Sequence, residues 1–266
     1  RLGVSPVSSG DLIQEFEAVW DKQMLDSHRT ASTLLYEIKD RTFAFIREHL
    51  ASGTLTEYNV QQQMVVWFDE LNLVSDCSPV VAVQENSSNP HYLPTASSHR
   101  AIESEQVVLI DLWAKVDRPG SVYADITWVG YTGKNPHPQA SEIFDLARTA
   151  RDAAVDLVIG RIEAGRPIAG WEVDQEARTV IANAGYGDRF IHRTGHNLGE
   201  QVHGNGAHLD DYETHDERRL ISGSGFTIEP GIYLENFGVR TEINMYISQD
   251  RASVTGPTQS ELALLK

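Results

Sequence analysis

Segment 108–128, VLIDLWAKVDRPGSVYADITW, most constrains the fold, because two apolar runs of β-strand character flank a Pro-Gly turn and each carries one aspartate. With Arg118 and Pro119 at the tip, antiparallel pairing places Asp111 directly opposite Asp125, with both carboxylates on one face. Like charges opposed inside an apolar sheet repel each other. This hairpin therefore needs a cation, a shared proton or a salt-bridge partner.

Length and charge limit the classes of protein that fit. The chain has 266 residues, 41% of them hydrophobic, which is enough for a sizeable core in one large domain or two small ones. Its net charge is -16, from 38 acidic and 22 basic residues. Nucleic acids and anionic membranes bind basic surfaces, so we expect neither as a partner.

Cysteine content and hydropathy bear on the compartment. The single cysteine, Cys77, excludes an internal disulfide, which fits a reducing environment. No apolar run is long enough for a transmembrane helix, and residues 1–10 lack the hydrophobic region of a signal peptide. We therefore expect a cytoplasmic protein, although export stays open because residue 1 is Arg and not Met.

Hydrophobic periodicity predicts a single α+β domain. Residues 1–12, rich in Ser, Pro and Gly, are predicted to be a linker or tail, and residues 13–266 show no composition shift that would mark a second domain. Apolar positions three and four residues apart indicate helices, and short apolar runs indicate strands. The predicted helices cover 11–50, 60–71, 143–162 and 173–181, and the predicted strands lie at 80–83, at 107–110 and in two runs within 226–247.

A second acidic hairpin lies near the C-terminus. With its tip at Glu235-Asn236, Glu229 is predicted to lie opposite Glu242, and Arg240 points from the same face. An acidic residue in a single strand usually occupies the solvated face. Two similar hairpins in one chain favour a shared, buried group of carboxylates instead.

A glycine-rich segment between the hairpins supplies an imidazole. Gly195 and Gly199 flank His196 and allow a close backbone approach, although a histidine among glycines is more often only a turn residue. The pair His192 and His196 does not form a helical zinc motif, because Thr194-Gly195 is a poor helix interior. Four carboxylates and one imidazole suit two divalent cations and two-metal hydrolysis.

These motifs resemble metallopeptidase family M24, the pita-bread fold of methionine aminopeptidases, Xaa-Pro aminopeptidases and prolidases. The matching segments, in order, are IDLWAKVDRPGSVYADIT, HRTGHNLG, TIEPGIY and GVRTEI. The resemblance implies a curved antiparallel sheet covered by helices and a site for two divalent metal ions, Mn²⁺ first, with Co²⁺, Zn²⁺ and Fe²⁺ as alternatives. It implies that Asp111 binds one metal, that His196 and Glu229 bind the other, and that Asp125 and Glu242 bridge them.

Further positions match the substrate side of the family site. His91 is similar to the histidine that faces the scissile amide, His203 to the one that stabilises the tetrahedral intermediate, and His192 to one that opens the glycine-rich loop. Without the resemblance, each would be read as a structural or surface histidine. Arg240 is similar to the arginine of the proline-specific branch, although it could also act only to neutralise the carboxylates.

The resemblance implies an exopeptidase that hydrolyses Xaa-Pro bonds, either an aminopeptidase or a dipeptidase. Its substrate would be a peptide with proline at the second position, its nucleophile a metal-bridging hydroxide, and Glu229 would shuttle the proton. A homodimer is compatible with this family. The alternatives are a catalytically silent binding module on the same fold, a methionine aminopeptidase, and a phosphotriester hydrolase that uses the same site.

The sequence also departs from the family pattern. The first hairpin is longer than usual between its aspartates, Trp128 stands where many relatives have Arg, and Gly204 follows His203 where an acidic residue is common. The N-terminal domain that proline-specific relatives carry is not part of this sequence. These differences leave the predicted metal ligands intact but put the shape of the substrate pocket in doubt.

Overall fold

The fold, described for residues 8–266 by a computed structural model, combines helices with three small sheets. The α-helices are α1 (Gly10–Glu17), α2 (Lys22–His49), α3 (Glu57–Glu70), α4 (Pro138–Glu163) and α5 (Gly170–Asn183). The first sheet contains β1 (Leu73–Val74), β2 (Val80–Val83), β3 (Val107–Val116), β4 (Ala124–Tyr131) and β11 (Ala263–Leu264). The second contains β5 (Asn197–Leu198), β6 (Gly225–Ile228), β9 (Ile243–Ser248) and β10 (Arg251–Val254), and β7 (Gly231–Tyr233) pairs with β8 (Gly238–Arg240). The predicted α+β class is confirmed.

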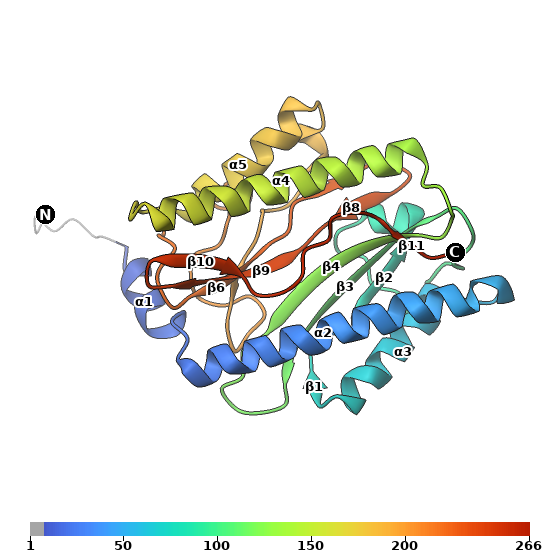
Figure 1. The fold of residues 1–266 in the computed structure, drawn as a ribbon, viewed down its shortest axis with the longest axis horizontal. Helices are drawn as coiled ribbons and strands as arrows, with labels where there is room; N and C mark the ends of the chain where they lie inside the picture. Colours follow the sequence, from blue (N-terminus) through green and yellow to red (C-terminus); the bar gives the residue numbers. More distant parts are fainter. Residues whose placement is uncertain (1–7) are drawn as a thin grey trace, which may run out of the picture.

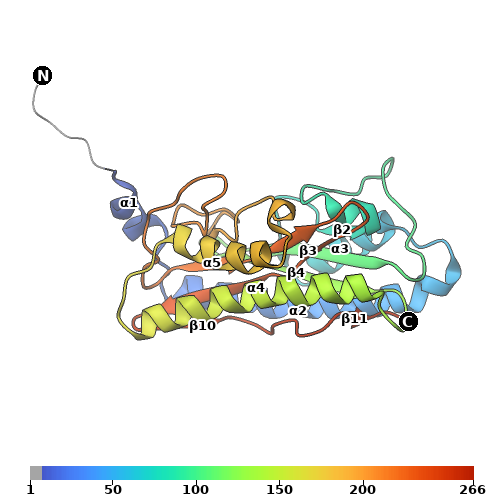
Figure 2. The same cartoon turned by 90° about the horizontal axis from the view of Figure 1, so that it is seen from above.

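Two long helices cover the strands from one side. Figure 1 shows α2 and α4 running alongside the strands, and Figure 2 shows both helices on one side of the sheets and the long loops on the other. Apolar residues of α2 and α3, such as Leu35, Ile38 and Met64, share one buried cluster with β2, β3 and β4. A second cluster joins α4 and α5 to strands β6 to β10. The face turned away from α2 and α4 is thus left for the loops.

The N-terminal helical region is divided, which corrects two predictions. Helix α1 begins at Gly10, so residues 10–12 are not part of a tail, and residues 1–7 lie outside the described part. The predicted continuous helix over 11–50 is interrupted before α2, where the Asp21 side chain caps the new helix by accepting a hydrogen bond from the Met24 amide. Trp20 is buried in this break, and its indole N–H donates to Leu198 O at 3.1 Å. Periodicity alone could not reveal this distant partner.

The register of the first hairpin differs from the prediction by two residues. Asp111 pairs with Thr127, and Asp125 pairs with Trp113. The predicted tight turn is a longer loop, in which Gly120 adopts a left-handed φ of 73°. A shift by two residues conserves the face on which side chains lie, so both aspartates still point to the same side.

The second hairpin has the predicted register but an interrupted ladder. Gly231 pairs with Arg240 on one side, and Ile228 pairs with Ile243 on the other, which aligns the two glutamates between them. At this position the two glutamate amides form hydrogen bonds with segments outside the hairpin. The Glu229 amide donates to Thr194 O at 2.7 Å, and the Glu242 amide donates to Thr127 O at 3.1 Å. The interruption therefore ties the glutamates to the histidine segment and to the first hairpin.

The Asn244 side chain joins the two larger sheets. Its Oδ1 accepts from the Asp125 amide at 3.0 Å, and its amide group donates to the Asp125 carbonyl. Replacing Asn244 by Leu keeps the volume but leaves both buried backbone groups of Asp125 unsatisfied. We expect Asn244→Leu to lower the free energy of unfolding by about 2–3 kcal/mol, measured by urea denaturation. An unchanged midpoint would show that this bridge does not hold the sheets together.

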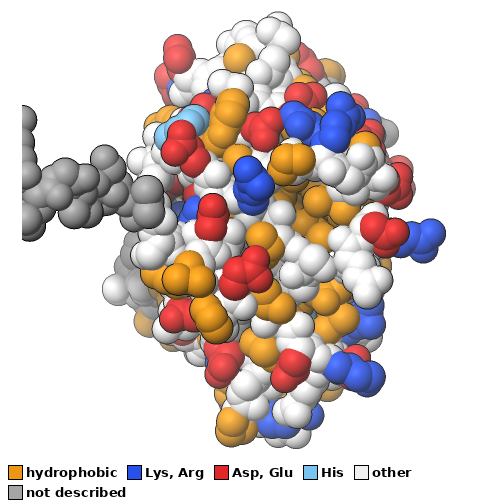
Figure 3. All heavy atoms as spheres, turned by 90° about the vertical axis from the view of Figure 1, so that its left-hand side faces the viewer, with side chains coloured by type: hydrophobic (Ala, Val, Ile, Leu, Met, Phe, Trp, Pro, Cys, Tyr) orange, Lys and Arg blue, Asp and Glu red, His pale blue; other side chains and the backbone are white. Residues whose placement is uncertain are grey.

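Two further features complete the fold. Strand β11 runs parallel to β4, so the first sheet is mixed, whereas an antiparallel sheet was expected. On the face in Figure 3, basic side chains are interspersed with acidic and hydrophobic ones. Within residues 8–266, no helix has the length and hydrophobicity needed to cross a bilayer.

Candidate metal centre and substrate cavity

The predicted site residues meet in one cavity of about 410 Å³, a volume typical of small-ligand sites. Strands β3, β4 and β8 and the segments next to β5, β6 and β9 form its floor, and loops after β1, β2 and β5 form its walls. The predicted residues among its lining are His91, Asp111, Asp125, His192, His196, His203, Glu229, Arg240 and Glu242.

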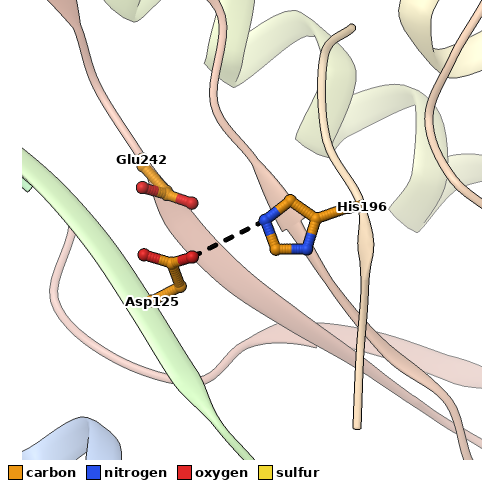
Figure 4. A group of neighbouring side chains, drawn as sticks. All are labelled: Asp125, His196 and Glu242. Carbon is orange, nitrogen blue, oxygen red and sulfur yellow. Dashed lines mark ion pairs between the residues drawn. The ribbon is translucent and has the colours of Figure 1, made fainter. Parts of the chain in front are cut away.

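Asp125, His196 and Glu242 form the tightest group in this cavity. One potential ligand atom from each lies within 4.8 Å of the others, and all three residues are buried. Figure 4 shows their side chains pointing toward one another, with His196 Nε2 at 3.6 Å from Asp125 Oδ2. The main chain that carries the imidazole is fixed, since the His196 amide donates to Thr227 Oγ1 at 3.0 Å and a Cβ at Gly195 would lie 2.1 Å from Thr227 O. The close backbone approach expected at both flanking glycines is present at Gly195 but not at Gly199, where a Cβ would meet nothing nearer than 3.8 Å.

The polar atoms of this group fit a divalent cation. Asp125 Oδ1 and Glu242 Oε1 are buried without a hydrogen-bond partner among the described residues. Burial, together with the surrounding carboxylates, raises the pKa of Asp125 and of Glu242 well above their usual values. His196 Nδ1 lies 3.3 Å from Asn197 O, an arrangement that leaves Nε2 free as a ligand atom. Oxygen and imidazole ligands of this kind suit Mn²⁺, Co²⁺, Zn²⁺ or Fe²⁺.

Glu229 borders the tight group. Its Oε1 lies 3.4 Å from His196 Nε2 and accepts a hydrogen bond from the Thr227 hydroxyl at 3.2 Å. Its Oε2 lies 3.7 Å from Arg240 Nε. Glu229 therefore lies beside the candidate metal position and lines the cavity, where it could serve both as a ligand and as a base.

Asp111 lies on the other side and pairs with Arg240. The guanidinium donates to Asp111 Oδ2, to the Thr127 hydroxyl at 3.0 Å and to the Tyr233 hydroxyl at 3.1 Å. Burial raises the pKa of Asp111 and outweighs the opposing effect of Arg240. The structure thus brings four predicted carboxylates together, but it holds Asp111 on Arg240, outside the tight group. These contacts favour a charge-neutralising role for Arg240.

Thr127 connects these two parts. Its hydroxyl donates to Glu242 Oε2 at 2.8 Å while it accepts from Arg240 Nε. We expect Thr127→Val, which conserves shape, to weaken Mn²⁺ binding by about 10- to 100-fold, because the Glu242 carboxylate loses the partner that orients it. Isothermal titration calorimetry would measure this affinity. Thr132→Val, a change at a hydroxyl elsewhere on the same chain segment, is the control, and equal affinities in all three proteins would contradict the prediction.

The three predicted substrate-side histidines also line the cavity. His91 is exposed in the loop after β2, and the His203 ring meets His196 edge-on, with 4.4 Å between ring centroids. Partial desolvation lowers the pKa of His203 to about 4, and burial lowers that of His192 to about 3, so both are neutral at pH 7. His192 Nε2 lies 2.7 Å from the Tyr233 hydroxyl, which in turn contacts Arg240. His192 therefore belongs to the Arg240 network.

Trp128 does not shape the cavity. It points to the opposite face of β4 from Asp125 and packs against α2, edge-on to Tyr36 and beneath Lys39 Nζ at 4.1 Å. The doubt that Trp128 raised about the substrate pocket is thereby removed. Sequence reasoning missed Thr127, Tyr233, Trp113 and Arg193, which the structure places in or beside the cavity. Period-two alternation signals Thr127, Trp113 and Tyr233, since each lies an even number of residues from a predicted ligand in the same predicted strand, whereas Arg193 lies outside the predicted strands.

Comparison with known proteins places the chain in a family. Residues 26–249 match the model of "Metallopeptidase family M24". The Xaa-Pro dipeptidase of Lactobacillus helveticus is 32% identical over 188 residues, which is 70% of this chain and 46% of that protein. The Xaa-Pro dipeptidase of Pyrococcus furiosus is 34% identical over 185 residues, 69% of this chain and 48% of that protein. The chain thus spans about half the length of the curated relatives it matches.

Solved structures of other proteins have a similar fold. The dipeptidase PepE from Mycobacterium ulcerans superposes with a TM-score of 0.81 at 26% identity, over 99% of this chain and 66% of that one. A prolidase from Thermococcus sibiricus superposes with a TM-score of 0.79 at 29% identity, over 96% of this chain and 65% of that one. The predicted pita-bread fold is confirmed. With this fold and the matched family model, the chain belongs to metallopeptidase family M24.

Proposed function

We propose that this protein is a metal-dependent exopeptidase that hydrolyses Xaa-Pro bonds. The observation that carries the proposal is a pair of buried carboxylate oxygens, on Asp125 and Glu242, that find no hydrogen-bond partner within residues 8–266 and that lie beside His196 at the floor of a cavity. The relatives named Xaa-Pro dipeptidase and prolidase support the choice of bond.

Two divalent cations fit the ligand set best, with Mn²⁺ as the first candidate. Asp125 and Glu242 would be ligands of both, His196 and Glu229 of one, and Asp111, which pairs with Arg240, of the other. Bound cations of this kind polarise a carbonyl and lower the pKa of water. Arg240 would remain beside them and limit the repulsion among the carboxylates.

Residues of the chain itself would move the proton and hold the substrate. Glu229, at the cavity edge of the ligand group, would take a proton from water and deliver it to the leaving amine. His203 is neutral and can donate one N–H to the oxygen that gains charge in the transition state. His91, exposed in the opposite wall, would contact the scissile amide, and His192 would act through Tyr233 and Arg240.

Hydrolysis of an Xaa-Pro dipeptide by the chelated protein, with and without added Mn²⁺ or Co²⁺, tests the proposal. We expect activity only with metal. Bound metal without hydrolysis of any Xaa-Pro peptide would overturn it. Parallel assays with a methionyl peptide and a phosphotriester would reveal the two other activities expected for this kind of site, and protein that neither binds metal nor turns over any substrate would be a silent binding module.

We further propose that the chain from α1 onward, residues 10–266, acts as one catalytic domain. The two hydrophobic clusters that flank the cavity both include strands of its floor. A homodimer stays a prediction, and the mass of the protein in solution measured by light scattering would check it.

A further inference from the structure

Glu57 is a fully buried acidic residue that the proposed chemistry does not use. It is the first residue of α3, and it does not line the cavity. The N-terminus of α3 is already capped by Thr56, whose hydroxyl oxygen accepts a hydrogen bond from the Asn59 amide at 3.1 Å. Burying a carboxylate is costly unless hydrogen bonds satisfy its oxygens. The partners of Glu57 therefore indicate what it does.

The hydrogen bonds that Glu57 accepts come from the end of β2 and from the loop after it. Its Oε1 accepts from the Val83 amide at 2.7 Å and from the Asn86 side-chain amide at 3.1 Å. Its Oε2 accepts from the Asn86 side chain at 3.0 Å, from the Tyr92 hydroxyl at 2.6 Å and from the Arg100 amide at 2.7 Å. One carboxylate thus joins both ends of this loop to its middle.

We call the loop after β2, residues 84–100, the wall loop, because residues 90–93 within it line the cavity. Among them is His91, which the proposed function places against the scissile amide. His91 is exposed, so burial among neighbouring side chains does not fix its position. Its position at the cavity must come from the main chain of the wall loop.

Tyr92 ties this part of the wall loop to Glu57. Within residues 89–94, as the structure describes them, the Tyr92 hydroxyl donates the only hydrogen bond that reaches beyond the wall loop. The amides of His91 and of Tyr92 donate locally, to Asn89 Oδ1 and to Asn89 O, both at 3.0 Å. Partial burial and the Glu57 carboxylate raise the pKa of Tyr92 above its ordinary value, so its hydroxyl stays a donor at pH 7. The residue next to His91 is thus held by Glu57.

A neutral group of the same shape cannot replace this carboxylate. The Val83 and Arg100 amides can only donate, and they approach different oxygens of Glu57. Glutamine keeps one acceptor oxygen and presents an N–H group in place of the other. Either β2 or the far end of the wall loop would then lose its acceptor. A displacement of about 1 Å, even one that begins far from the reacting atoms, can cost about 100-fold in rate.

We infer that Glu57 is a positioning residue for the reaction, because its carboxylate fixes the wall loop and, through Tyr92, presents His91 to the substrate. This inference rests on the proposed Xaa-Pro activity and on the role of His91 in it. Glu57 is not a catalytic residue, since it does not line the cavity and acts through other residues.

Kinetics of Mn²⁺-loaded protein with an Xaa-Pro dipeptide, in two backgrounds, test the inference. Glu57→Gln should reduce kcat/KM by about 10- to 100-fold and leave the Mn²⁺ affinity unchanged, because Glu57 contacts no candidate ligand. In the His91→Ala background, the same change should alter kcat/KM by less than about twofold, since no imidazole is left to misplace. Tyr92→Phe keeps the carboxylate and should cause a smaller loss, about 3- to 10-fold, so it serves if Glu57→Gln does not fold.

Two substitutions outside the cavity are matched controls. Glu172, in the first turn of α5, likewise accepts a backbone hydrogen bond, from the Ala169 amide at 2.8 Å, and does not line this cavity. Tyr131 likewise donates to a carboxylate, Glu105 Oε2, at 3.2 Å. Glu172→Gln and Tyr131→Phe should both keep the kcat/KM of wild type.

Hydrogen exchange of the wall-loop amides, followed by mass spectrometry, needs no turnover. Exchange should be faster in Glu57→Gln and unchanged in Glu172→Gln. Unchanged exchange in Glu57→Gln, or equal losses of kcat/KM with and without His91, would overturn the inference. A wild-type protein that hydrolyses no Xaa-Pro peptide would count against the proposed function instead. The exchange measurement then decides by itself whether Glu57 fixes the wall loop.

Discussion

Replacing Glu229 by Gln is expected to reduce kcat for an Xaa-Pro dipeptide by about 10²- to 10⁴-fold, which is the range that a positioned general base contributes. The amide has nearly the same shape and can still accept the hydrogen bond from the Thr227 hydroxyl at 3.2 Å. It cannot take up a proton from water at neutral pH. Steady-state kinetics at saturating Mn²⁺ would measure the loss.

Glu229 is also a candidate ligand, so the two roles must be separated. Metal content after gel filtration shows whether Glu229→Gln still binds Mn²⁺, and an inactive variant that retains metal identifies the base. Glu235→Gln, at the exposed turn between β7 and β8, changes the same chemical group outside the site and should be fully active. Activity of Glu229→Gln within about threefold of wild type would remove Glu229 from the mechanism.

Mn²⁺ is expected to raise the melting temperature by about 8–16 °C at pH 8, and by much less at pH 5. At about 1,000 times its dissociation constant, a ligand stabilises the folded state by about 4 kcal/mol, which corresponds to that shift for a chain of this size. Protons compete with metal for the buried carboxylates. Differential scanning calorimetry of chelated and Mn²⁺-loaded protein from pH 5 to pH 8 would measure both effects.

The direction of the pH effect follows from the carboxylates of the metal centre. In the metal-free protein, burial and mutual repulsion raise the pKa of Asp125 and of Glu242 above 3.8 and 4.5, their ordinary values. A carboxyl group whose folded-state pKa is raised favours folding below its unfolded pKa, and this advantage is lost as the pH rises through the folded pKa. The metal-free protein should therefore lose stability from about pH 4 upward, while metal binding strengthens.

A variant with fewer charges provides the control for this effect. Asp125→Asn combined with Glu242→Gln removes two of the repelling carboxylates, so it should be more stable than metal-free wild type at pH 8 and should gain nothing from Mn²⁺. A Mn²⁺-induced shift of equal size at every pH, or an undiminished shift in the double variant, would show that these carboxylates do not form the metal site.

Much of the candidate site could be predicted from local sequence. Alternation along two apolar runs placed Asp111 and Asp125 on one face, and this survived a register error because the error was two residues and not one. The C-terminal hairpin was predicted in its correct register, since Glu235-Asn236 marks a short connection. Helical periodicity likewise located α3, α4 and α5 to within a few residues. Each of these predictions depends only on residues close together in the chain.

Long-range contacts decided the rest. The break before α2 depends on the burial of Trp20 under Leu198, and the orientation of Trp128 toward α2 depends on which face of β4 the helix covers. No local pattern encodes such pairings, because their partners are brought together by packing.

The sequence by itself determined which acidic and imidazole groups this protein can gather and which face of each strand carries them, because side-chain direction follows from the strand period of two. Only the tertiary structure decided which of these groups lie together in the candidate metal centre and which one pairs with Arg240. It set Asp125, His196 and Glu242 within 4.8 Å of one another and turned Asp111 toward Arg240. The physical reason is that the division depends on the interrupted ladder at Glu229 and Glu242, where amides bond to Thr194 and Thr127 across the fold. Hydrogen bonds between distant segments, and not the order of residues, fix those positions.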